Sequence, residues 1–262
     1  MLNMIDLVQY VGTPIPDLGY ATVRDFCDSA DHLPQLMRFD GDMKDVQRTW
    51  AVKAILSRVP LGSMLLEVGA GEPAVAAALE ALGYDVTVID PYDGTGNGPQ
   101  AYERYAQTYP QVKIVRAFFD NRTSELAGQR YSCIYSVSVL EHIPPERTPD
   151  VFAAIAEHLQ PGGSSIHCVD HVVAGPTADW HLVKLRQVLF LQNKLKYPEA
   201  EDEEVRRLAD QALDTVLGAA ETDVETYYHS ALGHNVWRGG LPYDNFPFRK
   251  IISVQTCVNL GS

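Results

Sequence analysis

The segment Leu65–Ala74 combines residue types that suit the binding of a nucleoside. Its sequence, LLEVGAGEPA, is an apolar run followed by Gly69, Ala70 and Gly71. Glycines allow a sharp turn and a close approach of the backbone to a ligand, and a helix that begins there presents free N–H groups. Asp90 ends the next apolar run, roughly twenty residues further on, where a carboxylate can accept hydrogen bonds from two ribose hydroxyls. The spacing therefore predicts a nucleoside site; the alternative is a tight strand–helix turn with a solvated aspartate.

The residues around the glycines discriminate between nucleoside cofactors. With Ala74 in third place, the loop also fits the dinucleotide pattern G-x-G-x-x-G/A. Glu67, however, lies just before the first glycine, where its charge would repel a pyrophosphate but could hold the ammonium of a methionine moiety directly or through water. Pro73 removes an N–H donor that a pyrophosphate would use. Both residues argue against NAD, although an NAD(P)-linked oxidoreductase stays the competing enzyme class.

The stretch from Leu65 to Val169 resembles the class I S-adenosylmethionine (SAM)-dependent methyltransferases in five places. Its members carry (E/D)-x-G-x-G after the first strand, an acid after the second, an acid after the third, a signature on the fourth strand and a helix-closing phrase before the fifth. The matching residues are Glu67–Gly71, Asp90, Asp120 in FFDN, Tyr135–Ile143 (YSVSVLEHI) and Leu159–Gly163 (LQPGG). The chain departs from the family at Pro73, where many members have glycine.

The resemblance implies SAM as the cofactor and a set of residues that hold it. In the family the second acid contacts the ribose and the third contacts the adenine amine. Carried over, the cofactor-binding residues are Glu67, Gly69, Ala70, Gly71, Asp90, Pro91, Asp120, Asn121 and Ser136. Three residues before the core, Tyr10, Arg38 and Arg48, could also reach the cofactor's carboxylate, although solvated surface positions would explain them equally well.

Titratable residues near the ends of the fourth and fifth predicted strands are candidates for the methyl-transfer step. Asp170 and His171 follow the fifth strand, and His142 follows the fourth; a histidine can act as a general base near neutral pH. We predict these three as the catalytic residues and a hydroxyl oxygen as the acceptor atom. A metal site built from His167, Asp170, His171 and His181 is the rival use, but no tight ligand spacing supports it, and we expect none.

Composition and missing motifs favour a small-molecule acceptor. The formal net charge of −13 repels phosphate backbones, so we expect no nucleic-acid partner. The (D/N)-P-P-(Y/F) box of amino-methylating DNA enzymes and the Pro-Cys dipeptide of cytosine-5 enzymes are both absent. Four cysteines without a CxxC pair indicate a reducing cytosol, and no apolar run suits a secretion signal or membrane span. We therefore expect a cytoplasmic protein; a non-catalytic binding module with the same fold is a third possibility.

Alternating apolar strands and helices must position these residues. The fold class we predict is α/β: a Rossmann-like, doubly wound, mostly parallel sheet with N-terminal helices and a helical insertion before the last strand. Strands are expected near 63–68, 85–89, 113–116, 131–136, 164–169 and 250–260, and helices near 73–82, 97–108, 147–159, 180–196, 199–217 and 223–232.

Four parts of the chain follow from this pattern. Residues 1–60 should form a helical lid, with 17–58 helical apart from breaks, and residues 61–172 the SAM-binding core. Residues 173–245 should form a substrate cap over the carboxyl ends of the strands, and 246–262 the returning strand. The paired helices of the insertion suit a homodimer interface equally well. Trp180, Tyr227, Tyr228 and Trp237 could line an acceptor pocket or pack these helices.

Overall fold

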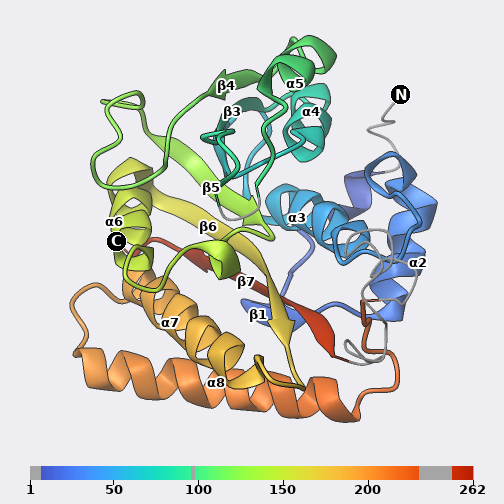
Figure 1. The fold of residues 1–262 in the computed structure, drawn as a ribbon, viewed down its shortest axis with the longest axis vertical. Coiled ribbons are helices and arrows are strands. Elements are labelled where there is room, and N and C mark those ends of the chain that lie inside the picture. Colours follow the sequence, from blue (N-terminus) through green and yellow to red (C-terminus); the bar gives the residue numbers. More distant parts are fainter. Residues whose placement is uncertain (1–6, 96–97, 230–249, 262) are drawn as a thin grey trace.

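A twisted sheet of seven strands forms the centre of the computed structural model, which describes residues 7–95, 98–229 and 250–261 (Figure 1). Its order is β1-β7-β6-β5-β2-β3-β4. The five strands from β2 to β6 are parallel to one another, whereas β7 runs antiparallel to both β6 and β1. The bounds are β1 Leu18–Tyr20, β2 Met64–Val68, β3 Asp85–Ile89, β4 Lys113–Val115, β5 Tyr131–Val137, β6 Leu159–Val172 and β7 Ile251–Asn259.

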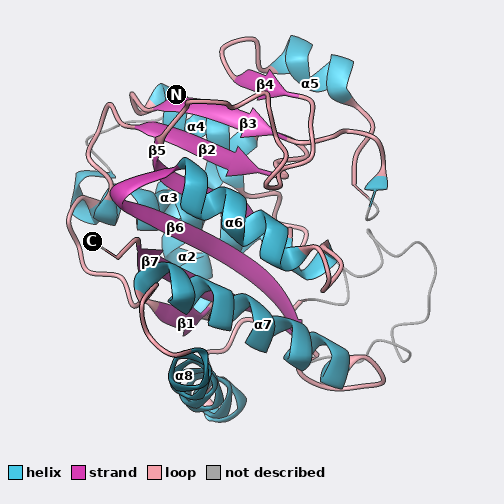
Figure 2. Cartoon of the chain, turned by 90° about the vertical axis from the view of Figure 1, so that its left-hand side faces the viewer, coloured by secondary structure: helices cyan, strands magenta, loops and turns pink. Residues whose placement is uncertain are grey.

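Helices cover both faces of the sheet, as Figure 2 shows. On one face lie α3 (Lys44–Arg58) and α4 (Ala74–Ala81), with α2 (Val23–His32) packed on α3. On the other lie α6 (Thr148–His158) and α7 (Ala178–Lys196), and α8 (Asp202–Thr222) packs on α7 and β1. The short α5 (Tyr102–Thr108) lies between β3 and β4 in the chain. This arrangement confirms the predicted doubly wound α/β class.

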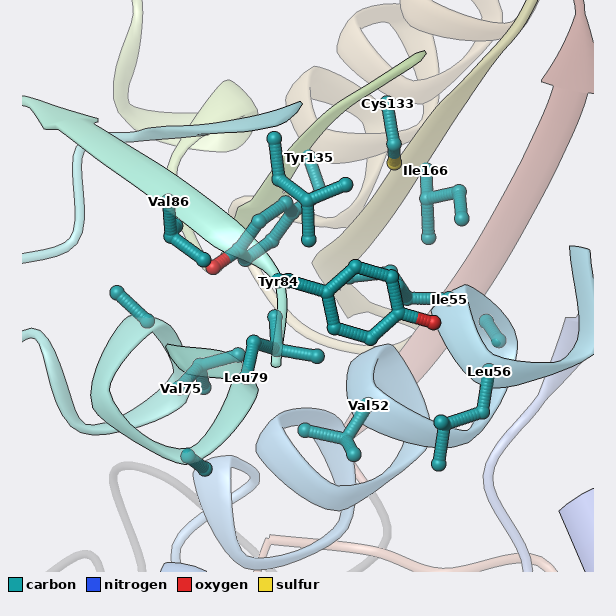
Figure 3. Close-up of a cluster of buried hydrophobic side chains, with 14 of the residues drawn as sticks. Val52, Ile55, Leu56, Val75, Leu79, Tyr84, Val86, Cys133, Tyr135 and Ile166 are labelled. Carbon is teal, nitrogen blue, oxygen red and sulfur yellow. The ribbon is translucent and has the colours of Figure 1, made fainter. Parts of the chain in front are cut away.

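Two apolar cores separate the sheet from its helical layers. In the first, Ile55 of α3 and Leu79 of α4 meet Tyr135 and Ile166 of the sheet, and all four are fully buried (Figure 3). The second core joins the opposite face of the sheet to α6, α7 and α8. Short apolar strands buried on both faces are typical of parallel sheets.

Three predicted elements differ from the structure. Leu18–Tyr20 lies in a stretch predicted to be helical, yet it forms the edge strand β1, because its backbone pairs with β7. Strand β6 begins at Leu159, not after the glycines, and continues to Val172. Residues 223–229 form turns and isolated bridges instead of a third helix, and the remainder of that predicted helix lies outside the described residues.

The two long helices lie elsewhere than expected. The second core, defined above, contains buried leucine and valine side chains of both helices: Leu185, Val188 and Leu189 of α7 and Leu213 of α8. Together the helices form part of the layer that covers this face of the sheet. The division of the chain into a lid, a core, a cap and a returning strand stays a prediction.

Replacing Leu79 should test the packing of the first core. Leu79→Ala removes a fully buried side chain, so we expect the free energy of unfolding to fall by about 2–5 kcal/mol in urea denaturation. The matched control is Leu208→Ala on α8, where the leucine is 42% exposed; a change of about 0.5 kcal/mol or less is expected there. Equal losses at the two positions would contradict this description of the core.

Candidate functional site

The glycine loop lies where β2 ends at the carboxyl edge of the sheet. Gly69 and Gly71 have φ angles of 68° and 57°, in the left-handed region that favours glycine. A Cβ atom on Gly69 would lie 2.8 Å from the methyl groups of Val139, which follows β5. At Gly71 the nearest atom to such a Cβ would be the Cγ of Pro99, at 3.4 Å. The first glycine is therefore required by packing and the second by backbone conformation.

Asp90 braces this loop from the end of β3. Its carboxylate accepts the N–H of Gly71 at 2.9 Å and the N–H of Tyr92 at 2.8 Å, and the Tyr92 hydroxyl donates to the Gly71 carbonyl at 2.8 Å. Burial raises the pKa of Asp90, and the two N–H bonds oppose that shift. The structure thus brings Asp90, the residue predicted to bind the ribose, into direct contact with the glycine loop.

Glu67 lies beneath the loop and is 2% exposed. Its Oε2 accepts the N–H of Ala76 in α4 and the hydroxyl of Tyr135, both at 3.1 Å. Burial, the largest cause, raises the pKa of Glu67 to about 7. Its carboxylate therefore binds groups of the protein, which argues against the predicted direct contact with a ligand's ammonium.

Cations from the N-terminal segment flank the loop. Arg38 forms an ion pair with Glu72, whose other oxygen accepts the hydroxyl of Tyr109 at 2.8 Å. Arg48 of α3 is 8% exposed, and its charge lowers the pKa of both Glu67 and Glu72. Tyr10, the third candidate, instead donates to Asp28 of α2. Arg48 is thus a nearly buried cation beside the loop.

The remaining predicted cofactor ligands differ in their burial and in their hydrogen-bond partners. Half-buried Pro91 and Ala70 lie in the loops at the strand ends. Asp120 accepts hydrogen bonds from Arg147 at 2.6 Å and from Arg122; although burial opposes it, these bonds lower its pKa. Asn121 is exposed and faces Asp150.

Ser136, a predicted cofactor ligand, lies in the interior of the protein. The side chain is 1% exposed, and its Oγ lies 2.7 Å from Nδ1 of His167, inside the layer that α6 and α7 cover. The same histidine contacts Ser165 through Nε2 at 2.8 Å. The Ser136 hydroxyl thus binds a group of the protein, and a role for Ser136 in holding the cofactor stays a prediction.

A chain of hydrogen bonds joins the ends of β5 and β6. The Ser138 hydroxyl donates to Oε1 of Gln47 at 2.9 Å, and the Gln47 amide donates to Oδ1 of Asp170 at 2.7 Å. The N–H of Asp170 donates in turn to Glu141 at 3.1 Å. Gln47 is fully buried, whereas Asp170 is half-buried. Gln47 and Glu141 were not among the predicted site residues. The sequence does not reveal that α3 reaches this edge. After the fourth strand, His142 was selected because a histidine can act as a base near neutral pH, and the adjacent Glu141 was not.

The predicted histidines occupy very different surroundings. His142 is exposed, in the short 3-10 helix η4 (Leu140–His142). His171 lies within β6, not past it as predicted, and is 3% exposed; burial lowers its pKa to about 4. His167 is fully buried, and burial lowers its pKa to about 3. Of the predicted catalytic residues, Asp170 and His142 therefore remain accessible at the edge, whereas His171 does not.

The aromatic side chains that could line an acceptor pocket also differ in their exposure and contacts. Trp180 is 48% exposed and lies edge-on to His181. Tyr227 stacks on Phe26, and Tyr228 packs against the second core; Trp237 lies outside the described residues. Within the described ranges, no group of three or more His, Cys, Asp or Glu side chains could hold a metal ion, and no helix is long and apolar enough to cross a membrane.

The buried carboxyl of Glu67 should make stability depend on pH. Its pKa is about 7 in the folded protein against 4.5 ordinarily, so the folded state binds the proton more tightly. This stabilisation is full below pH 4.5 and is lost as the pH rises through about 7. The glutamine of Glu67→Gln does not titrate, so this variant lacks that loss of stability. The free energy of unfolding of the variant, taken relative to that of the wild type, should therefore rise by roughly 2–3 kcal/mol from pH 5 to pH 8.

Urea unfolding at several pH values measures this difference. Glu125→Gln, at an exposed position, is the control and should track the wild type throughout. A constant difference between Glu67→Gln and the wild type would show that Glu67 is ionised at both pH values.

Comparisons with known proteins agree with this arrangement. A family model described as a methyltransferase domain matches residues 44–214, more than half of the chain. Two uncharacterized proteins of Mycobacterium tuberculosis, from strains CDC 1551 and H37Rv, are each 30% identical over 111 residues, which is 42% of this chain and 36% of theirs. The chain thus spans about a third of the length of these curated relatives.

Solved structures with similar folds include three methyltransferases. The glycopeptide N-methyltransferase MtfA complexed with sinefungin is 15% identical, with a TM-score of 0.40 over 48% of this chain and 54% of that one. A TehB-like SAM-dependent methyltransferase from Corynebacterium glutamicum is 19% identical, with a TM-score of 0.40 over 52% and 70%. The 1,6-didemethyltoxoflavin-N1-methyltransferase of Burkholderia thailandensis is 21% identical, with a TM-score of 0.41 over 63% and 69%.

The match to the family model extends from α3 through the glycine loop and all five parallel strands into α8. It therefore includes Arg48, Gly71, Asp90, Glu141 and Asp170. By that match, the chain belongs to the methyltransferase domain family.

Proposed function

We propose that this protein transfers a methyl group from SAM to a hydroxyl oxygen of a small-molecule acceptor. The observation that carries the proposal is the contact between Gly71 and Asp90 at the carboxyl edge of a doubly wound sheet. Ligands of such sheets bind outside the carboxyl ends of the strands. Membership of the methyltransferase domain family supplies the class of reaction.

The residues at the loop suit SAM in size and charge. Gly69 and Gly71 leave the backbone uncovered, and Asp90 offers carboxylate oxygens to ribose hydroxyls. Arg48 is the cation for the carboxylate of the methionine moiety, because it is nearly buried beside the loop. Further along the edge, Ala70, Pro91, Asp120 and Asn121 are the proposed contacts to the nucleoside. When SAM is bound, it supplies a methyl group on a sulfonium, which an acceptor oxygen can take while its proton leaves.

The acceptor half of the site supports a hydroxyl nucleophile. A hydroxyl needs a base to remove its proton, whereas a neutral amine does not. Asp170 is half-buried at the edge, and its carboxylate is oriented by Gln47. It can receive the proton, with the exposed His142 as a second group able to exchange protons with solvent. The net charge of −13 argues against nucleic acid as the acceptor.

The cysteines support a reducing compartment. Cys133, Cys168 and Cys257 are buried free thiols, and Cys27 is an exposed one. Exposed free thiols are unusual where disulfides form readily. We therefore propose the cytoplasm as the location.

Removing the Asp90 carboxylate should weaken cofactor binding. Asp90→Ala loses charge-assisted hydrogen bonds worth roughly 1.5–3 kcal/mol each, so titration calorimetry should give a SAM affinity at least about tenfold lower. The control is Asp93→Ala, an exposed carboxylate three residues away that should bind SAM like the wild type. An unchanged affinity in Asp90→Ala would remove the ribose assignment, and binding of NAD or NADP in place of SAM would favour the oxidoreductase.

A side chain at Gly71 should abolish binding altogether. Gly71→Val places a β-branched residue at a φ of 57° in the loop itself, so no SAM binding is expected in the same titration. Gly83→Val is the matched control, because Gly83 also has a positive φ, with open space around it and no part in the loop. If both variants, or neither, lose SAM binding, the loop is not the cofactor site.

A further inference from the structure

Glu141 is a buried carboxyl directly behind Asp170. It lies in η4, within the fourth-strand signature Tyr135–Ile143, and is 3% exposed. Its Oε1 accepts the backbone N–H of Asp170 at 3.1 Å. Its Oε2 is buried and has no hydrogen-bond partner among the residues described. An ionised carboxylate with one oxygen so placed is costly, because charge is buried without full compensation.

Charged groups from three elements face Glu141. Asp170 of β6 contributes a like charge, and Lys44 at the start of α3 an opposite one. Lys184 of α7 is 2% exposed and donates to the Thr148 hydroxyl. Burial lowers the pKa of Lys184 to about 8, although the charge of Glu141 acts in the opposite direction. Lys184 therefore holds its proton, and with it its positive charge, less tightly than an ordinary lysine does. The surroundings thus favour a Glu141 without charge.

Burial first, and the charge of Asp170 second, raise the pKa of Glu141 to about 8. At neutral pH Glu141 therefore keeps its proton. The group behind the backbone of Asp170 is then a neutral carboxyl. A glutamine would accept the same N–H bond, so the hydrogen bond alone does not account for a carboxyl here.

We propose that Glu141 is a positioning residue for Asp170: through its hydrogen bond it orients the backbone of Asp170, and it places a neutral group, not a second charge, behind the side chain that accepts the proton of the acceptor hydroxyl. This inference rests on the proposed function. With SAM bound, the acceptor's O–H bond would break and its proton would pass to a carboxylate oxygen of Asp170. The oxygen's electron pair would form the new bond to the methyl carbon, while the methyl–sulfur bond breaks and its electron pair stays on the sulfur as a neutral thioether. Glu141 keeps its own proton throughout, and Asp170 then returns the transferred proton to solvent.

Carboxyl NMR tests the pair without an acceptor or a cofactor. Protein with ¹³C-labelled Asp and Glu carboxyls is titrated as wild type, Glu141→Gln and Asp170→Asn. The wild type should show one glutamate titrating near pH 8 that is missing in Glu141→Gln and moves down by about one unit or more in Asp170→Asn. The inference is overturned if no glutamate assigned to this position titrates above about pH 6, or if Asp170→Asn leaves its midpoint unchanged.

The pH dependence of turnover tests the role in catalysis. With any acceptor that is methylated, wild-type kcat should fall above about pH 8, because two ionised carboxyls repel one another and displace Asp170. Glu141→Gln should lack that fall while SAM affinity stays unchanged; Glu146→Gln, at an exposed position, is the control and should keep the wild-type profile. A wild-type profile in Glu141→Gln would reduce Glu141 to a hydrogen-bond acceptor. If no acceptor or SAM is used at all, the proposed function fails while the NMR result stands.

Discussion

The close approach of Gly69 to Val139 is the contact on which the carboxyl edge depends. A single added carbon on Gly69 would lie 2.8 Å from the valine methyls, a distance that real side chains do not adopt. The contact joins the end of β2, which leads into the glycine loop, to the segment after β5, which carries Ser138 and Glu141. Because interiors are close-packed and transmit strain, the loop and the acceptor half of the site cannot shift independently.

A second constraint is the burial of carboxyl groups in an acidic chain. Glu67, Asp90 and Glu141 are each at least nine-tenths buried, and each accepts at least one backbone N–H. Such bonds, from the glycine loop, the start of α4 and strand β6, partly replace lost hydration. In all three cases burial still raises the pKa. For Glu67 and Glu141 the pKa reaches about 7 and about 8, so these two groups carry less negative charge near neutral pH than ordinary glutamates.

The sequence predicts those parts of the fold that local patterns determine. Apolar runs, glycines and helix signals specify the parallel strands, the glycine loop and its contact with Asp90. Edge strand β1 escapes prediction because three residues, Leu18–Tyr20, have no periodicity and pair only with distant β7. Strand β6 is longer than predicted, since Pro161 and the glycines after it suggest a break that pairing overrides. Gln47 joins the site only through tertiary packing, which no local pattern records; Glu141 lies in the fourth-strand signature, but its contact with Asp170 also depends on tertiary packing.

The place of β7 between β6 and β1 determines the order in which this sheet can be completed. Among the described strands β7 comes last in the sequence and β1 first, yet they are neighbours, and β7 is the described strand that pairs with β6 on that side. While the chain is being synthesised, the β6 edge stays unpaired and β1 has no strand to join until β7 leaves the ribosome. Contacts of such high sequence separation slow folding, and an open strand edge invites pairing with other chains. Until β7 has been synthesised, the free edge of β6 therefore remains open to pairing with a strand of another chain.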